Sequence, residues 1–195
     1  MLQSVSGASR PFLAVRLHIL KGSQRPKSRQ SQVPGRAAGV DPHLCYSPLM
    51  RQPVLRPAHP RDFPFCERLY FAEMDPIITQ LGLDMARQRE SFARQWHVAE
   101  VRIITISGED IGWLQTKTSD STLFLGQLYL SVHMQRQGIG TRVLQMLIEE
   151  ARRAGEPITL GVVKINPARR LYERLGFQRT HEDRHKVYMR LQPGG

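Results

Sequence analysis

The chain carries the stretch Gln135-Arg136-Gln137-Gly138-Ile139-Gly140-Thr141 between an apolar run and an amphipathic segment. The apolar run, residues 123–130, is predicted to be a buried strand, and the apolar positions after the stretch recur at helical spacing until Gly155. A glycine-bearing loop between a strand and a helix presents backbone N–H groups, and the helix dipole adds partial positive charge. The stretch therefore predicts a site for a phosphate-bearing ligand.

The spacing of this glycine pair excludes two common nucleotide-binding motifs. The dinucleotide fingerprint needs a third glycine or small residue, but Arg142 and Val143 occupy the relevant positions. A Walker A loop needs Gly-Lys-Ser/Thr, which does not follow here. Nucleotide-dependent phosphoryl transfer and hydride transfer are therefore disfavoured, and the glycine pair alone identifies no ligand.

A second pattern covers residues 158–177. Residues 158–165 are rich in β-branched side chains and predict a strand, after which Asn166 suits an N-cap and Pro167 the first helical position. A short helix is expected to end at Gly176. Tyr172 lies beside the apolar stripe of that helix, so it is either an ordinary core tyrosine or a phenol directed into a cleft.

Together, the stretch at 135–141, Asn166 and the run Tyr172-Glu173-Arg174-Leu175-Gly176-Phe177 resemble the GNAT superfamily of acyl-CoA N-acyltransferases. The resemblance covers roughly residues 54–191. It implies an α+β (mixed α/β) GNAT-like fold, with a mixed, mostly antiparallel central sheet and helices on both faces. It also implies a splayed pair of strands that binds coenzyme A.

The resemblance further implies the positions of the cofactor contacts, with acetyl-CoA as co-substrate and no metal. The pyrophosphate would rest on Gln135, Arg136, Gln137, Gly138, Ile139, Gly140 and Thr141. The pantetheine arm would bond the backbone near Leu130 and Val132 in the manner of an added strand. Asn166 would either contact the cofactor or cap the helix that carries Tyr172, and we favour the cap.

The resemblance implies direct attack of an amine on the thioester. A backbone N–H around Leu130 would stabilise the developing oxyanion. Tyr172 would bind the cofactor and act as the general acid that protonates the departing thiolate, because a phenol with a pKa of about 10 stays protonated at neutral pH.

The proton acceptor is where the sequence departs from the commoner family pattern. Many members place a glutamate on the strand before the loop, but no carboxylate lies between Asp120 and Glu149, and Gln127 sits in that strand. The candidates are His133, just after the strand, and Glu100 or Asp110 near the preceding strands. His133 is the first of these, and none is assigned as the base by the residues alone.

Composition indicates a reduced protein without a membrane span. The two cysteines, Cys45 and Cys66, are too few for a disulfide scaffold, and no apolar stretch approaches the roughly 20 residues needed to cross a bilayer. The formal charge of +11 raises nucleic-acid binding as an alternative, but residues 1–50 contribute +6 of it and no stacking motif accompanies the basic residues. We expect an amine acceptor as the partner, no nucleic acid, no membrane, and a monomer or homodimer.

Residues 1–50 differ from the rest of the chain. They carry seven Lys/Arg and one acid, lack periodicity, and predict a disordered basic extension before a domain at 51–195. Such a composition also fits a mitochondrial transit peptide. We favour disorder, or a true translation start at Met50, over targeting, and therefore expect a cytoplasmic protein that is mitochondrial only if the extension is a real transit peptide.

The remaining elements follow from hydrophobic periodicity. We expect a strand at 54–56, a helix at 61–73, a break at 74–76, and a second helical region to about residue 96. A hairpin of strands 100–106 and 111–116 turns at 107–110, and residues 186–191 are expected to form an edge strand. An N-acetyltransferase is the favoured function, and a catalytically silent acyl-CoA-binding module is the main alternative.

Overall fold

The computed structural model describes residues 52–80 and 82–194, so the basic extension predicted at 1–50 lies outside the described residues. Seven strands form one sheet in the order β1-β2-β3-β4-β5-β7-β6. The strands are β1 Val54–Pro57, β2 Val101–Ile106, β3 Glu109–Ser119, β4 Thr122–Leu130, β5 Ile158–Val163, β6 Gln178–Glu182 and β7 Lys186–Leu191. Every neighbouring pair is antiparallel except β4 and β5, which are parallel.

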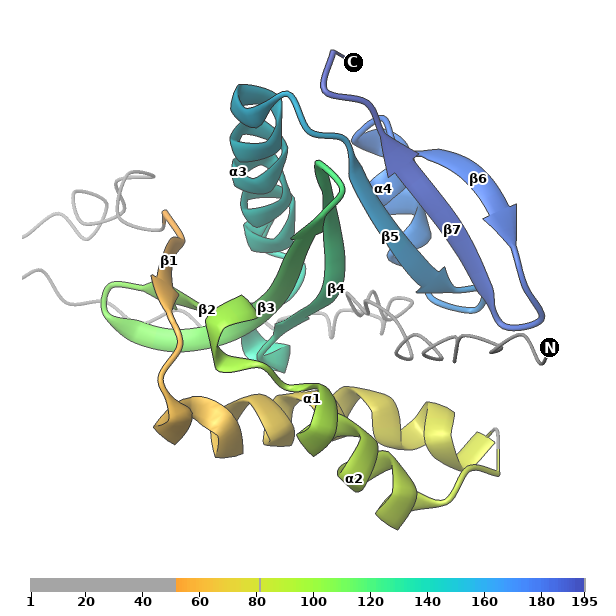
Figure 1. Ribbon diagram of the computed structural model, residues 1–195. Helices are drawn as coiled ribbons and strands as arrows, with labels where there is room; N and C mark the ends of the chain where they lie inside the picture. The colour runs from red at the N-terminus through yellow and green to blue at the C-terminus, as the bar shows by residue number, and fades with distance from the viewer. Residues whose placement is uncertain (1–51, 81, 195) are drawn as a thin grey trace, which may run out of the picture.

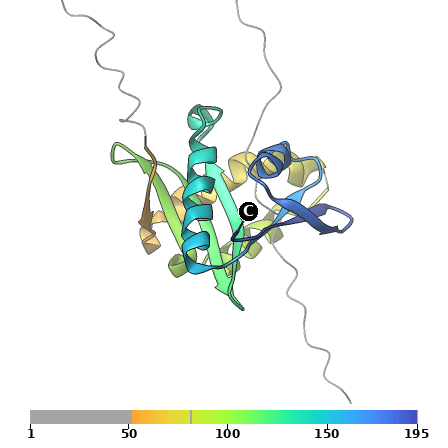
Figure 2. The ribbon, with the colours of Figure 1, turned by 90° about the horizontal axis from the view of Figure 1, so that it is seen from above.

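Helices cover both faces of the sheet (Figures 1 and 2). They are α1 Phe63–Gln80, α2 Met85–Gln95, α3 Ile139–Ala154 and α4 Arg169–Arg174. α1 and α2 pack on one face, whereas α3 and α4 pack on the other. The predicted fold, a mixed and mostly antiparallel sheet with helices on both faces, is confirmed.

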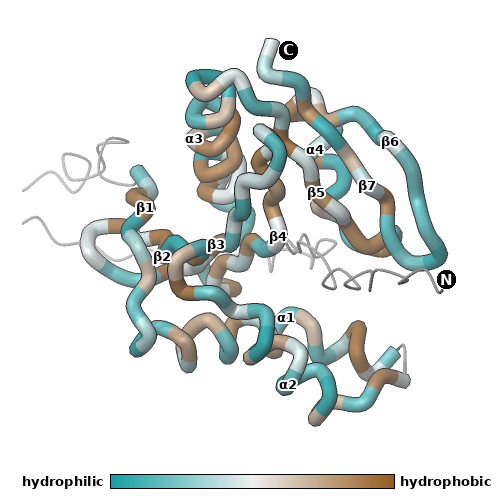
Figure 3. The backbone as a smooth tube through the Cα atoms, viewed as in Figure 1, coloured by the Kyte–Doolittle hydropathy of each residue, from teal (hydrophilic) through white to brown (hydrophobic). Residues whose placement is uncertain are grey.

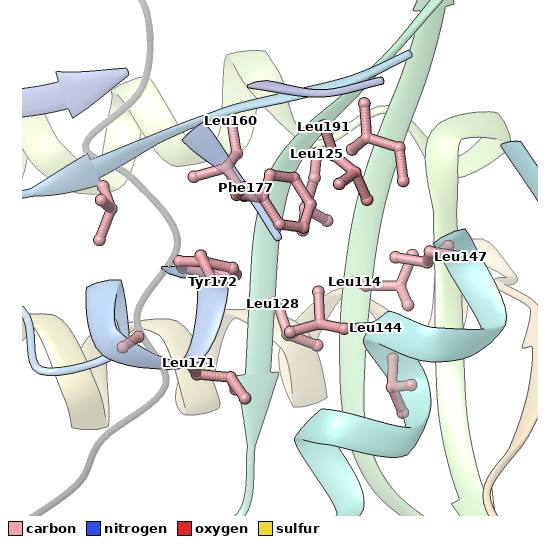
Figure 4. Packing of buried hydrophobic residues seen from close by; sticks show 14 of the residues in the cluster. Leu114, Leu125, Leu128, Leu144, Leu147, Leu160, Leu171, Tyr172, Phe177 and Leu191 are labelled. Atoms are coloured by element: carbon pink, nitrogen blue, oxygen red, sulfur yellow. The ribbon is translucent and has the colours of Figure 1, made fainter. Parts of the chain in front are cut away.

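Two separate hydrophobic cores result. The core beneath α3 and α4, which we call the aliphatic core, is built mainly from leucine, isoleucine and valine, and Figure 4 shows part of it. The core beneath α1 and α2, which we call the aromatic core, is dominated by rings: Tyr70, Phe71, Phe92, Trp113 and Tyr129. Side chains alternate across each strand, so β3 and β4 contribute to both cores.

The predicted break at 74–76 is wrong, because α1 continues through Pro76 to Gln80. Proline inside a helix removes one backbone hydrogen bond and costs roughly 3 kcal/mol. Met74, Ile77 and Ile78 are each at most 3% exposed in the aromatic core. Burial of such side chains is worth about 1.5–3 kcal/mol apiece, which is enough to keep the segment helical.

The ends of the sheet also correct the sequence interpretation. β7 was expected at the edge, but it lies between β5 and β6, and β6 is the edge strand. All five residues of β6 are exposed and hydrophilic (Figure 3), so no alternation of apolar side chains marked it as a strand. The predicted turn at 107–110 is also shorter: Ser107 and Gly108 alone have positive φ, and Glu109 begins β3.

Candidate active site

β4 and β5 separate partway along their length. They pair only over Leu123–Leu125 and Ile158–Leu160, and then diverge (Figure 1). On the other side of β4, the pairing with β3 shifts register by one residue, because Gln115 pairs with Gln127 whereas Thr116 pairs with Leu125. Gly126 is the extra residue of this bulge, and bulges bend a strand and increase its twist. The bulge therefore lies where β4 turns away from β5.

The hydrogen-bond pattern shows which backbone groups of β4 face the gap between β4 and β5. Ser131 donates its N–H to Ile111 O at 2.8 Å, so Leu130 and Gly112 form a pair that exchanges no hydrogen bonds of its own. The N–H and C=O of Leu130 therefore point away from β3, toward the gap. The same holds for Leu128, two residues earlier, which the sequence interpretation did not name.

The glycine loop lies immediately after β4 and opens α3. Gly138 is the N-cap of α3 with φ of +79°, and no side chain caps the helix. The first helical hydrogen bond runs from Arg142 N–H to Gly138 O at 3.1 Å. Ile139, Gly140 and Thr141 consequently have no acceptor for their N–H groups within the helix. A helix N-terminus that no side chain caps suits phosphate oxygens.

Side chains of the loop fix its shape. Gln135 Nε2 donates to Leu130 O at 2.9 Å and to Glu73 Oε1 at 3.0 Å. Gln137 Nε2 donates to His133 O. These contacts tie the loop to the end of β4 and to α1, so the helix N-terminus and the gap are held in fixed relation. Arg136 has φ of +61°, an uncommon conformation for a non-glycine residue.

Glu73 was missed by the sequence interpretation. It is 6% exposed on the buried side of α1, together with Cys66, Tyr70 and Ile77. A carboxylate at a position of the apolar stripe was the available signal, since acidic residues are rarely buried without a partner. Its oxygen and Leu130 O bond the same nitrogen of Gln135, so the two oxygens are at most about 6 Å apart.

Asn166, predicted to be an N-cap, lies in the turn between β5 and α4. It is 3% exposed, and its Oδ1 accepts the N–H of Ala168 at 2.9 Å. The following turn is tight, with Leu171 donating to Ala168 O at 2.9 Å, so the regular helix α4 begins only at Arg169. The N-cap of α4 is Ala168, and no side chain caps the helix, so Asn166 holds the turn before α4. β5 ends at Val163, two residues before the strand end expected from the sequence.

Tyr172 is fully buried in the aliphatic core (Figure 4). Its ring meets Phe177 edge-on, with ring centroids 5.7 Å apart. Its hydroxyl is buried and has no hydrogen-bond partner. Burial raises the pKa of the phenol far above its ordinary value, because the ionised form loses hydration. The residue is therefore part of the core and also presents a protonated, unsatisfied hydroxyl.

The remaining candidates for the proton acceptor lie in different surroundings. His133 and Val132 belong to a 3₁₀ turn, Val132–Met134, after β4, and both are exposed. Asp110 forms an ion pair with Arg56 at 2.7 Å, and Glu100 Oε2 accepts a hydrogen bond from Gln115. The two carboxylates are thus engaged in structural contacts, whereas His133 stays accessible beside the loop.

Charge and potential metal ligands complete the description of the site. Lys164, after β5, pairs with Glu182 of β6 at 3.1 Å. Among residues 52–80 and 82–194, no group of three or more His, Cys, Asp or Glu side chains is placed to hold a metal ion. In the same ranges, no helix combines the length and the apolar character that a membrane crossing requires.

Comparison with known proteins identifies the domain. No curated protein matches the chain by sequence. Residues 93–179, from the end of α2 into β6, match a family model described as an acetyltransferase (GNAT) domain.

Solved structures share the fold. PaiA N-acetyltransferase from Thermoplasma acidophilum, in complex with coenzyme A, has a TM-score of 0.59 at 14% identity, over 72% of this chain and 99% of that one. The ribosomal-protein-S18-alanine N-acetyltransferase from Escherichia coli has a TM-score of 0.53 at 21% identity, over 72% and 94%. Ard1 from Thermoplasma volcanium has a TM-score of 0.54 at 17% identity, over 72% and 97%. The glycine loop at the N-terminus of α3 and the parted strands β4 and β5 lie within residues 93–179, the part of the chain that matches the acetyltransferase (GNAT) family model.

Proposed function

We propose that this protein transfers the acetyl group of acetyl-CoA to a primary amine of a small molecule or protein. The observation that carries the proposal is the continuity of one surface. The gap between β4 and β5 opens beyond Leu125, and the N–H groups of Leu128 and Leu130 point into it. The gap leads to the N-terminus of α3, which no side chain caps. This continuity suits a ligand with an extended amide-bearing arm and a pyrophosphate, which is the chemistry of coenzyme A.

In this proposal the pyrophosphate binds the N–H groups of the loop at 135–141, and the pantetheine arm follows β4 toward the bulge. The N–H of Leu128 or Leu130 polarises the thioester carbonyl and stabilises its oxyanion. Leu130 O is already held by Gln135, so Leu130 offers the arm mainly its N–H. Val132 is exposed beyond the end of β4 and would contact the arm near the pyrophosphate.

The chemical step is a direct displacement. The amine nitrogen forms a bond to the thioester carbon, the C–S bond breaks, and Tyr172 gives its hydroxyl proton to the leaving sulfur. The raised pKa of Tyr172 means that the phenol is protonated at neutral pH, and the tyrosinate left after the transfer takes up a proton again from solvent. The proton of the amine passes to His133, which is exposed beside the loop, and to solvent. Holding both substrates together supplies much of the rate.

The proposal is tested by measuring thiol release from acetyl-CoA against a panel of primary amines, with coenzyme A affinity measured separately by calorimetry. Turnover with at least one amine is expected. Tight coenzyme A binding without turnover of any amine would instead favour a silent acyl-CoA-binding module.

The loop itself is tested with Gly138→Asp and its matched control Gly138→Asn. Both side chains tolerate the positive φ of Gly138 better than most, and they differ by one charge. The carboxylate of Gly138→Asp, set beside the pyrophosphate, is expected to weaken coenzyme A binding at least about tenfold relative to Gly138→Asn. Equal affinities of the two variants would contradict a pyrophosphate at this loop.

A further inference from the structure

Gln127 is a buried amide whose two polar atoms both lack partners. It is 1% exposed on β4, directly after the bulge at Gly126, and neither Nε2 nor Oε1 has a hydrogen bond. Its cross-strand neighbour Gln115 is also buried, but Gln115 Nε2 donates to Gln95 O and to Glu100 Oε2, each at 2.9 Å. The two glutamines therefore have the same chemistry and adjacent positions, and only one is satisfied within the protein.

The face of the sheet on which Gln127 lies follows from alternation along β4. Leu128 belongs to the aliphatic core, whereas Tyr129 belongs to the aromatic core, so Gln127 shares the face of Tyr129. Tyr172 lies on the opposite face, in the aliphatic core. A thioester held at Leu128 or Leu130 would thus have the leaving-group acid on one face and the amide of Gln127 on the other. The face of Gln127 is the one left for the attacking amine.

An amide buried without partners is unfavourable, since an apolar side chain of similar size would avoid the loss of hydration. The indole N–H of Trp113 is also unpaired, but it leaves only a single donor without a partner. Gln127 leaves both a donor group and an acceptor without partners, on the residue just before Leu128, whose backbone N–H faces the gap. A ligand that satisfies it must offer a donor and an acceptor side by side.

We propose that Gln127 binds the acceptor, and that the acceptor is an α-amine adjacent to a carbonyl, as at the N-terminus of a peptide. This inference rests on the proposed acyl transfer. In such a group the amine N–H donates to Gln127 Oε1, and the neighbouring carbonyl accepts from Nε2. The ε-amine of a lysine side chain has no carbonyl within that reach, so it can satisfy only one half of the amide.

The chemistry of the neutral amide favours the same class of acceptor. An amide cannot take a proton from an ammonium group, so the acceptor bound by Gln127 reacts as the neutral amine. α-Amino groups have a pKa of about 7.7–8.0 and are roughly a third neutral at pH 7.5. Lysine side chains have a pKa of about 10.4 and are about 0.1% neutral at that pH. A much larger fraction of the α-amine is therefore in the reactive neutral form at this pH.

The experiment compares two probes, alanyl-alanine amide and Nα-acetyl-lysine amide, with the wild type, Gln127→Leu and Gln115→Leu. The wild type is expected to prefer the alanyl probe by at least about 100-fold in kcat/KM at pH 7.5, from the difference in neutral fraction alone. Gln127→Leu is expected to lose about tenfold or more in kcat/KM for the alanyl probe and clearly less for the lysine probe, whose amine can satisfy only half of the amide. Its affinity for coenzyme A should be unchanged.

Stability separates binding from a structural role. Gln127→Leu is expected to keep or raise the Tm, because it removes an unsatisfied amide, whereas Gln115→Leu is expected to lower the Tm and keep the probe preference. Equal use of the two probes by the wild type, an equal loss on both in Gln127→Leu, or a lowered Tm in Gln127→Leu would each overturn the inference.

A binding measurement distinguishes this failure from failure of the proposed function. Calorimetric titration of alanyl-alanine amide into the coenzyme A complex is expected to give affinity in the wild type and about tenfold weaker affinity in Gln127→Leu. If neither probe is turned over but this difference is found, the proposed transfer fails and the acceptor site stands. If the wild type gives no binding heat and no turnover with the alanyl probe, the site assignment is wrong.

Discussion

The two sides of β4 differ in how completely they are paired. Toward β3, β4 is paired from Thr122 to Leu130 with a single bulge, and the aromatic core packs the strands against α1 and α2. Toward β5, the pairing stops after three residues, and two unsatisfied side chains, Gln127 and Tyr172, lie on opposite faces of the sheet near the gap. Complete pairing and packing stabilise a fold, whereas unmet backbone and side-chain groups are what a ligand can use. β4 thus stabilises the fold through its edge toward β3 and offers groups to a ligand through its edge toward β5.

The largest expected effect is on catalysis at the incompletely paired edge. Tyr172→Phe removes the only group placed to protonate the leaving thiolate in our proposal, and loss of a general acid typically lowers rates about 100- to 10,000-fold. The measurement is the initial rate of thiol release under saturating acetyl-CoA. Coenzyme A affinity and the Tm should be unchanged or slightly higher, because the hydroxyl that is lost has no partner.

The control for Tyr172→Phe is Tyr70→Phe, a second buried tyrosine on the other face of the sheet. Burial raises the pKa of Tyr70 to about 12, so it too stays protonated, but it packs among the rings of the aromatic core. The rate of thiol release by the Tyr70→Phe variant should stay within a few-fold of the wild-type rate. A fully active Tyr172→Phe would show that the leaving thiolate obtains its proton elsewhere.

The second-largest expected effect is on protein stability and concerns the aromatic core, which packs β3 and β4 against α1 and α2. Phe92 is 1% exposed and contacts the rings of Tyr70, Phe71 and Trp113. Phe92→Ala should lower the free energy of unfolding by about 3–5 kcal/mol, through lost burial and the cavity left behind. Denaturant unfolding measures the change.

The contrasting variant is Phe124→Ala, since Phe124 is 37% exposed on β4 and should cost less than about 1.5 kcal/mol. Coenzyme A affinity of folded Phe92→Ala should stay within about twofold of wild type, because Phe92 packs against rings of α1 and β3 and has no ring contact with the glycine loop. A tenfold loss of that affinity would show that the aromatic core also shapes the cofactor site.

The elements that carry the proposed donor side have stronger local sequence signals than those of the proposed acceptor side, and the reason is physical. The glycine loop, Asn166 and Tyr172 lie in or beside elements with strong local signals, namely a helix N-terminus, the turn before a helix and an apolar stripe. Glu73 and Gln127 depend on which strand or helix lies opposite them, and no local pattern contains that information. The bulge at Gly126 adds to this difficulty, because it changes which side chains of β4 face each core.

Errors in the predicted elements have the same origin. Pro76 is a strong local signal for a helix break, but the burial of neighbouring residues in the aromatic core overrides it. β6 is hydrophilic throughout and is a strand only because β7 supplies hydrogen-bonding partners along one edge. In both cases tertiary contacts decided the structure against the local sequence.

The smallest expected effect is on stability and concerns the ion pair between Arg56 and Asp62. Arg56 lies on β1, the edge strand on the β3 side of β4. Arg56 of β1 donates to both oxygens of Asp62, at 2.8 and 3.1 Å, which joins the first strand to the start of α1. These hydrogen bonds from Arg56 hold the pKa of Asp62 below its ordinary value. Asp62→Asn should lower the free energy of unfolding by about 1 kcal/mol at pH 7, a modest amount because Arg56 is 31% exposed and water screens the pair.

The pH dependence of this variant has a defined sign. A carboxyl whose pKa is lower in the folded protein stabilises it at pH values above the unfolded pKa of about 3.9, and that contribution is lost as the pH falls through the folded pKa. Thermal unfolding of wild type and Asp62→Asn should therefore differ by a constant amount between pH 5 and 7 and converge below about pH 3.9. A difference that persists unchanged into strong acid would mean that Asp62 acts through its hydrogen bond to His59 N–H, which an asparagine also accepts, and that its charge contributes little.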